Sequence, residues 1–236
     1  MKNEFDRVSR QILKEDDYFY VSDSGSTYNA LNEQPLISKK DKSNSFSVER
    51  NYINSKAYHN KFEKLPVNKE LQNVLYKQTG RLLEFIDGLP DDEMEKERLL
   101  AVNGRTGEFL VDNFDREAEV FRTGFNDEEM KKINECEDSV IIIHNHSHNG
   151  RPSAKDIITY YESDKIKLSL IACHDGDLYC ILWVNELFID IYNELLEIEK
   201  SKTMDIEVAK RRATTQIYEL NDSVSERHKF FKVLRM

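Results

Sequence analysis

Two histidines separated by one residue carry the strongest chemical signal in this chain. His144 and His146 follow directly on the apolar run Ile-Ile-Ile at 141–143. Such a β-branched run predicts a buried strand, and alternate residues of a strand point to the same face. Both imidazoles are therefore expected to point into one site, where they could bind a metal ion.

A third ligand is expected from the segment that follows. Pro152 precedes Ser153-Ala-Lys-Asp156, and a serine followed three residues later by an acid is typical of a helix start. Asp156 could complete a site of two imidazoles and one carboxylate with an open position for water. Zn²⁺ accepts this set and lowers the pKa of bound water toward about 7. The same pattern is also that of a helix cap without any metal, and this alternative stays open.

Hydrolysis at such a site needs a base that takes a proton from the water. The acidic candidates are Glu93, Glu95 and Glu97, and Glu97 directly begins an apolar segment that predicts a strand. Glu95 would lie on the same strand face as Glu97, and a solvated acidic cluster is the ordinary alternative. Periodicity alone therefore leaves Glu95 and Glu97 open as the base. Ser153, at the helix start, could donate to an oxyanion on the attacked carbonyl.

The rest of the pattern predicts an α+β domain with a curved mixed β-sheet flanked by helices. We place the metal at the end of the 139–143 strand, near the edge of the sheet. Residues 230–234 form a short apolar terminus. Strands are expected at 97–102, 108–112, 139–143, 168–173 and 178–184. Helices are expected at 68–86, 126–136, 153–162, 186–200 and 205–220.

The first 60 residues carry weaker signals. Residues 7–20 could form one helix, and residues 21–51 are rich in Ser, Asn, Asp and Lys, which indicates a linker or flexible arm. We therefore expect an unassigned N-terminal region over 1–60, and one domain with a C-terminal helical extension over 61–236.

Composition limits the partners of the protein. The chain of 236 residues has 34 basic and 44 acidic side chains, hence a formal net charge of −10, which argues against binding along a nucleic-acid backbone. No apolar run is long enough to span a membrane, and the N-terminus lacks the apolar core of a signal peptide. The three cysteines, Cys136, Cys173 and Cys180, form no C-x-x-C pair. Cys173 and Cys180, on the two arms of one predicted hairpin, are expected to be small core residues in a reducing compartment. We expect a cytoplasmic protein without nucleic-acid or membrane partners.

Together, Glu97, His144-Asn145-His146 and Ser153-Ala-Lys-Asp156 resemble the signature of the JAB/MPN/JAMM metallopeptidase family. The resemblance implies a JAB/MPN-like (cytidine-deaminase-like) fold and a zinc ion bound by the two histidines and Asp156. It also implies that Glu97 is the general acid/base, that Ser153 stabilises the oxyanion, and that the substrate is a protein or peptide cleaved at a peptide or isopeptide bond.

The resemblance covers about residues 60–235 and is strongest over 97–184. Segments 88–107 and 170–179 are similar to the bacterial and phage branch, which often accompanies phage head-morphogenesis (MuF-like) proteins and polymorphic toxins. Two departures stand out: Ser147 occupies a position where many relatives have proline, and the spacing from His146 to Asp156 is one residue shorter than in eukaryotic deubiquitinating members. We expect His148 to be a polar loop residue, with a spare ligand or a substrate contact as alternatives.

Two other functions fit parts of the pattern. A non-catalytic JAB-like domain of phage or toxin origin could act as an interaction or scaffold module, but such members typically lose ligands and this chain retains all three. A different metal hydrolase, with His-x-His on a barrel strand, would need further ligands downstream. His174 and His228 are the histidines left there, and the chain is short for a closed α/β barrel.

Overall fold

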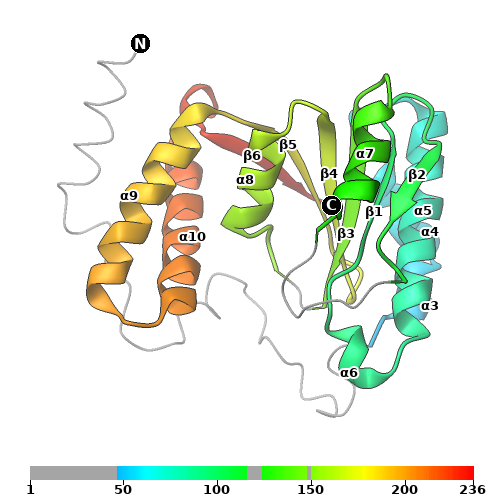
Figure 1. The fold of residues 1–236 in the computed structure, drawn as a ribbon, viewed down its shortest axis with the longest axis horizontal. Coiled ribbons are helices and arrows are strands. Elements are labelled where there is room, and N and C mark those ends of the chain that lie inside the picture. Colours follow the sequence, from blue (N-terminus) through cyan, green and yellow to red (C-terminus); the bar gives the residue numbers. More distant parts are fainter. Residues whose placement is uncertain (1–46, 116–123, 148–149) are drawn as a thin grey trace. The chain divides into compact units, whose positions relative to one another are not determined.

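The computed structural model describes residues 47–115, 124–147 and 150–236 (Figure 1). The predictions for residues 1–46 and for His148 lie outside these ranges. The helices are α3 (Arg50–Ile53), α4 (Lys56–Phe62), α5 (Lys69–Asp87), α6 (Asp91–Met94), α7 (Asp127–Glu135), α8 (Ala154–Glu162), α9 (Glu186–Lys202) and α10 (Ile206–Ser223), with a 3₁₀ turn η3 (Glu226–His228). The strands are β1 (Leu99–Asn103), β2 (Phe109–Asp112), β3 (Val140–His146), β4 (Ile166–Cys173), β5 (Leu178–Val184) and β6 (Phe231–Arg235).

The strands form one mixed sheet in the order β2-β1-β3-β4-β5-β6. β3 and β4 run parallel, joined by α8 as a crossover helix, and the other neighbours are antiparallel. The predicted α+β class and mixed sheet are confirmed. β6 was expected only as an apolar terminus; it becomes a strand because it pairs with the exposed edge of β5.

The histidines lie at the end of β3, as expected, but the prediction that the site is near the edge of the sheet is wrong. β3 has β1 on one side and β4 on the other, so it is an interior strand, and the edges are β2 and β6. The strand also runs on to His146 instead of ending at residue 143, because its pairing with β4 continues through His146↔Cys173. The two histidines therefore lie at the carboxyl end of a central strand.

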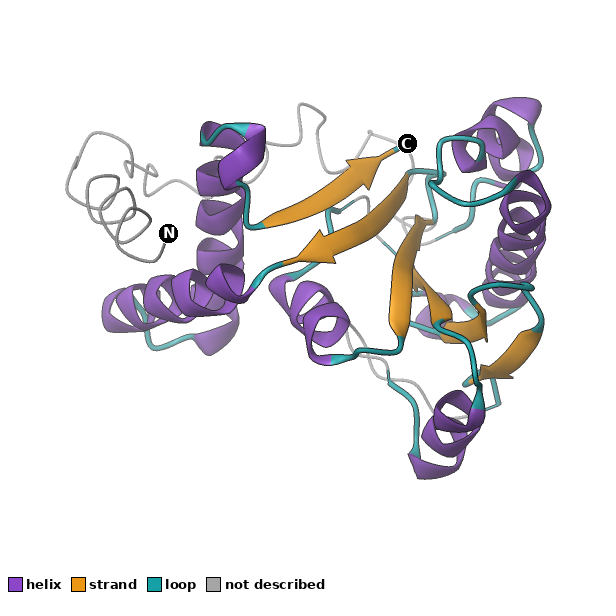
Figure 2. Cartoon of the chain, turned by 90° about the horizontal axis from the view of Figure 1, so that it is seen from above, coloured by secondary structure: helices purple, strands orange, loops and turns teal. Residues whose placement is uncertain are grey.

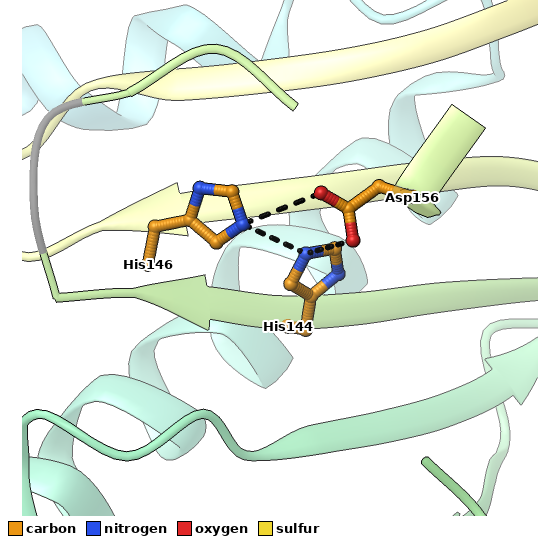
Figure 3. A group of neighbouring side chains, drawn as sticks. All are labelled: His144, His146 and Asp156. Atoms are coloured by element: carbon orange, nitrogen blue, oxygen red, sulfur yellow. Dashed lines mark hydrogen bonds and ion pairs between the residues drawn. The ribbon is translucent and has the colours of Figure 1, made fainter. Parts of the chain in front are cut away.

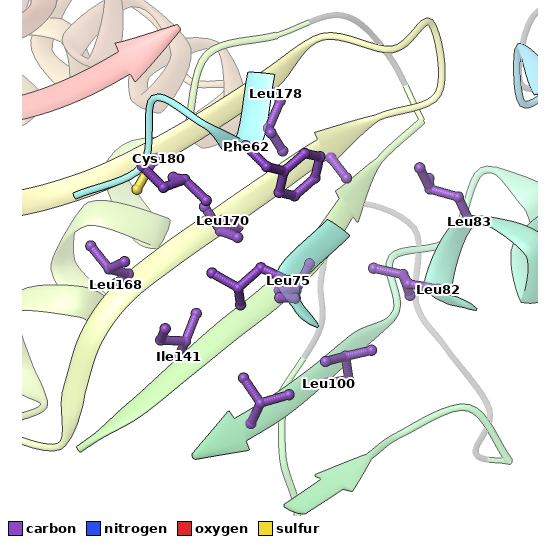
Figure 4. Packing of buried hydrophobic residues seen from close by; sticks show 14 of the residues in the cluster. Phe62, Leu75, Leu82, Leu83, Leu100, Ile141, Leu168, Leu170, Leu178 and Cys180 are labelled. Atoms are coloured by element: carbon purple, nitrogen blue, oxygen red, sulfur yellow. The ribbon is translucent and has the colours of Figure 1, made fainter. Parts of the chain in front are cut away.

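Helices cover both faces of the sheet (Figure 2). Ile141 and Ile143 pack in one core with Leu75 of α5 and Leu100 of β1 (Figure 4). Val140, on the other face, packs in a second cluster with residues such as Ile133 of α7. The histidines have the same parity as Val140, so they point away from the α5 core.

The core begins before the expected domain boundary at residue 61. Ile53 of α3 and Tyr58 and Phe62 of α4 are buried in the same cluster as Leu75. These two helices span only four and seven residues, which is too short for an apolar period to be recognised in sequence. Among the described residues, no helix combines the length and the apolar character needed to cross a bilayer.

Candidate metal centre

β3 brings the two imidazoles together. His144 is nearly buried, and its Nε2 lies 3.3 Å from Nε2 of His146, with the ring centroids 5.1 Å apart. Both side chains point to the face on which α8 begins (Figure 3). The spacing expected from an i, i+2 pair on one strand face is therefore present.

The start of α8 adds the carboxylate. Ser153 is the N-cap: its side chain accepts a hydrogen bond from the Asp156 N–H, and Asp156 Oδ2 accepts from the Ser153 N–H at 2.7 Å, which completes a capping box. Asp156 Oδ1 lies 3.5 Å from His144 Nε2, and Oδ2 lies 3.5 Å from His146 Nε2. Asp156 thus belongs both to the capping box of α8 and to the candidate metal group, so the two alternatives left by the sequence are compatible.

The spacing of the three side chains is compatible with a bound metal ion such as zinc. A tetrahedral zinc with bonds of about 2.0–2.2 Å separates its ligand atoms by about 3.3–3.6 Å. The separations here are 3.3 Å between the imidazole nitrogens, 3.5 Å from His144 Nε2 to Asp156 Oδ1 and 3.5 Å from His146 Nε2 to Asp156 Oδ2, so each imidazole lies at this spacing from a different oxygen of the carboxylate. In the described ranges, His144, His146 and Asp156 form a group whose ligand atoms all lie within 4.8 Å of one another. The donor set, two nitrogens and one oxygen, is one that zinc accepts.

Glu97 is the acidic candidate that reaches this group. Its Oε1 lies 3.7 Å from Nε2 of His146, and its side chain is almost buried. Glu97 precedes β1 instead of starting it, since the strand begins at Leu99. Glu93 lies in α6 and pairs with Lys96, and Glu95 is the C-cap of that helix. The geometry therefore favours Glu97 over its neighbours.

Burial and charge act differently on the four groups. Burial raises the pKa of Glu97 to about 7 and lowers that of His144 to about 4. Burial also disfavours the charged forms of His146 and Asp156, but the neighbouring groups prevail. Asp156 and Glu97 raise the pKa of His146, and His144 and His146 hold the pKa of Asp156 well below its usual value. The lone pairs of two imidazoles and a carboxylate face one another here, and a positive charge between them is needed to stabilise this arrangement. A proton on His146 or a metal ion provides it.

Ser153 is engaged with Asp156. Its Oγ lies 2.8 Å from Asp156 Oδ2, so the hydroxyl orients the carboxylate. The loop before it is held by α10, because the Tyr218 hydroxyl donates to the Pro152 carbonyl at 2.9 Å. The guanidinium of Arg151 lies over the ring of Tyr218, 5.0 Å from its centroid. α10 therefore helps to place the N-terminus of α8.

Sequence reasoning missed two groups that support the candidate site. The Gly150 carbonyl forms a hydrogen bond with His146, which contributes to the raised pKa of that imidazole. Asn145 is fully buried and hydrogen-bonded to residues on both sides of Glu97. Its signal was available, because an amide in the middle of a buried strand needs specific partners.

The alternative of a barrel hydrolase finds no support in the described part of the chain. The sheet is open, with β2 and β6 at its edges. His174 is buried and hydrogen-bonded to Asn145. His228 lies in η3 and forms a hydrogen bond with Ser225. Neither histidine joins the three-residue group.

Comparisons of the chain with protein-family models, with curated proteins and with solved structures gave no significant match. The assignment of a function therefore depends on the chemistry of the site.

Proposed function

We propose that this protein is a zinc-dependent peptidase or isopeptidase of the JAMM type, with a JAB/MPN-like (cytidine-deaminase-like) fold of the bacterial and phage branch. The observation that supports this most is the convergence of two imidazoles and a carboxylate at 3.3–3.5 Å, with a second, buried carboxylate 3.7 Å from one imidazole. A structural zinc site is usually closed by four protein ligands, whereas a hydrolytic site has three and an open position. The set of three ligands with an adjacent base favours hydrolysis.

His144, His146 and Asp156 would hold the zinc ion. When bound, zinc supplies Lewis-acid activation of the water and of the substrate carbonyl. Ser153 and the Gly150 carbonyl fix the orientation of Asp156 and His146, because each occupies a hydrogen-bonding position of its ligand.

Glu97 would move the proton. Its Oε1 accepts a proton from the water while the water oxygen forms a bond to the carbonyl carbon. The same carboxyl group then gives that proton to the amine nitrogen as the C–N bond breaks, so the products are a carboxylic acid and an amine. A general base works best when its pKa lies near the working pH. Burial raises the pKa of Glu97 to about 7.

Ser153 would stabilise the oxyanion that forms on the carbonyl. Its hydroxyl now lies against Asp156 Oδ2, so it would donate to substrate after a rotation about its Cβ–Oγ bond. The backbone N–H of Ser153 continues to bond Asp156, which keeps the carboxylate in place during this rotation.

A chelation experiment tests the proposal. The protein is incubated with a peptide library, and new termini are mapped by mass spectrometry. We expect cleavage by the zinc-loaded protein, loss of cleavage after chelation, and recovery when zinc is added back. Recovery should fail in His146→Ala. Cleavage that persists in the chelated protein would contradict the proposal, and a zinc-loaded protein that cleaves nothing would favour an interaction or scaffold module.

A further inference from the structure

Asn145, the residue between the two histidines, faces away from the candidate metal centre. Side chains alternate along β3, so Asn145 shares the face of Ile141 and Ile143, on which the α5 core packs. It is completely buried. A buried amide is costly unless its oxygen and its nitrogen both have partners, so its contacts are informative.

Asn145 forms hydrogen bonds with the backbone on both sides of Glu97. Asn145 Oδ1 accepts a hydrogen bond from the Arg98 N–H at 2.6 Å, and Nδ2 donates to the Lys96 carbonyl at 3.3 Å. The first group belongs to the peptide unit after Glu97 and the second to the peptide unit before it. One side chain thus fixes both peptide planes that flank the Cα of Glu97.

The hydrogen bonds of the Asn145 side chain lie just beyond the end of the β1–β3 pairing. The β1–β3 register ends at Leu99↔His144, and one further backbone bond runs from the Asn145 N–H to the Arg98 carbonyl at 3.2 Å. Glu97 lies beyond β1, so the ladder of that strand does not fix its backbone. The amide of Asn145 supplies hydrogen bonds at this point.

His174 holds the amide in its orientation. A backbone N–H only donates and a carbonyl only accepts, so the oxygen and nitrogen of Asn145 are assigned without ambiguity. Nδ2 then lies 3.0 Å from Nε2 of His174, which must act as the acceptor. His174 is itself buried, and its backbone N–H donates to the backbone carbonyl of His146 at 3.1 Å.

We infer that Asn145 is a positioning residue for Glu97 and that His174 supports it; this inference rests on the proposed metal-dependent function. Asn145 therefore links the two parts of the site, since its neighbours in β3 provide two ligands and its side chain holds the segment with the base. Loss of the amide would free both peptide units around Glu97. A shift of about 1 Å in a catalytic group can lower a rate by about 10²-fold.

The test uses Co²⁺ in place of zinc, because its visible absorption bands report the surroundings of the metal without any substrate. Glu97→Gln, Asn145→Ala and the double variant are compared with the unaltered protein. We expect all four to bind one equivalent of Co²⁺. The two single variants should shift the bands in the same direction, and the double variant should add nothing, because Asn145 acts through Glu97.

Asn113→Ala is the matched control. Asn113 is also a buried amide, and its Oδ1 accepts the Leu99 N–H at 2.8 Å, one residue beyond the bond that Asn145 makes. It should leave the Co²⁺ bands unchanged. A shift equal to that of Asn145→Ala would show a general response of the sheet and would overturn the inference.

The other outcomes separate the inference from the proposed function. Asn145→Ala with unaltered bands, beside a shifted Glu97→Gln, overturns the positioning role alone, and so does an additive double variant. A protein that binds no Co²⁺, or a Glu97→Gln without any shift, overturns the proposed site and the inference with it. If Asn145→Ala does not fold, His174→Leu should shift the bands and His174→Gln, which keeps an acceptor, should not; the reverse overturns the inference.

Discussion

Removal of His146 should abolish the thermal stabilisation that zinc gives to this protein. Nε2 of His146 lies 3.3 Å from His144 and 3.5 Å from Asp156, so it is one of three converging donors. A ligand that binds only the folded state, at a free concentration 100-fold above its Kd, stabilises by about 2.7 kcal/mol. In a domain of about 150–250 residues each kcal/mol shifts Tm by about 2–4 °C. Zinc at that concentration should therefore raise the Tm of the unaltered protein by about 5–11 °C.

Scanning calorimetry of chelated protein, titrated with zinc, measures this shift. His146→Ala should show almost none of it at the same zinc concentration. His228→Ala is the control, because His228 lies in η3 with Ser225 and outside the three-residue group, and it should keep the whole shift. A His146→Ala protein that zinc stabilises as fully as the unaltered one would refute the reasoning.

Three further predictions follow from other contacts. Leu75→Ala, at a completely buried position of α5, should lower the free energy of unfolding by about 2–5 kcal/mol in urea titrations, and a loss below about 0.5 kcal/mol would contradict the packing. Ser153→Ala should cost about 0.5–2 kcal/mol through the lost cap of α8, as should Asn126→Ala at the matched cap of α7, but only the first should also weaken zinc binding. The raised pKa of His146 stabilises the metal-free protein below about pH 6.5, the usual histidine pKa, and this contribution is lost as the pH rises through the raised value. Zinc competes with the proton on His146, so the zinc affinity should rise with pH, by at most about tenfold per pH unit for one displaced proton. Calorimetric titrations that show no pH dependence of the zinc affinity would exclude this competition.

The elements around the site were predictable because their signals are local. The β-branched run before His144 predicted β3, and Ser153-x-x-Asp156 predicted the start of α8, where the structure has a capping box. The helix expected at 126–136 is α7, and its start is likewise determined locally, by the Asn126 cap and the acidic first turn. In each case the residues that determine the structure lie within one turn or one strand of each other.

The parts that were missed depend on contacts between distant segments. β6 is a strand because it pairs with β5, and β3 extends to His146 because β4 pairs with it. Periodicity could not separate Glu95 from Glu97, since the choice depends on how the chain enters β1 beside β3. The role of Asn145 needed the position of residues 96–98, which are more than forty residues earlier in the chain.

A comparison of unaltered protein with Glu97→Gln tests the central claim most directly. Zinc content and peptide-bond cleavage are measured in the same samples, so that loss of the base is separated from loss of the metal. Both proteins should hold one zinc per chain, and the variant should cleave about 10²–10⁴-fold more slowly, as expected when a general base is removed. Equal cleavage by the two zinc-loaded proteins would contradict the assignment of Glu97 as the base.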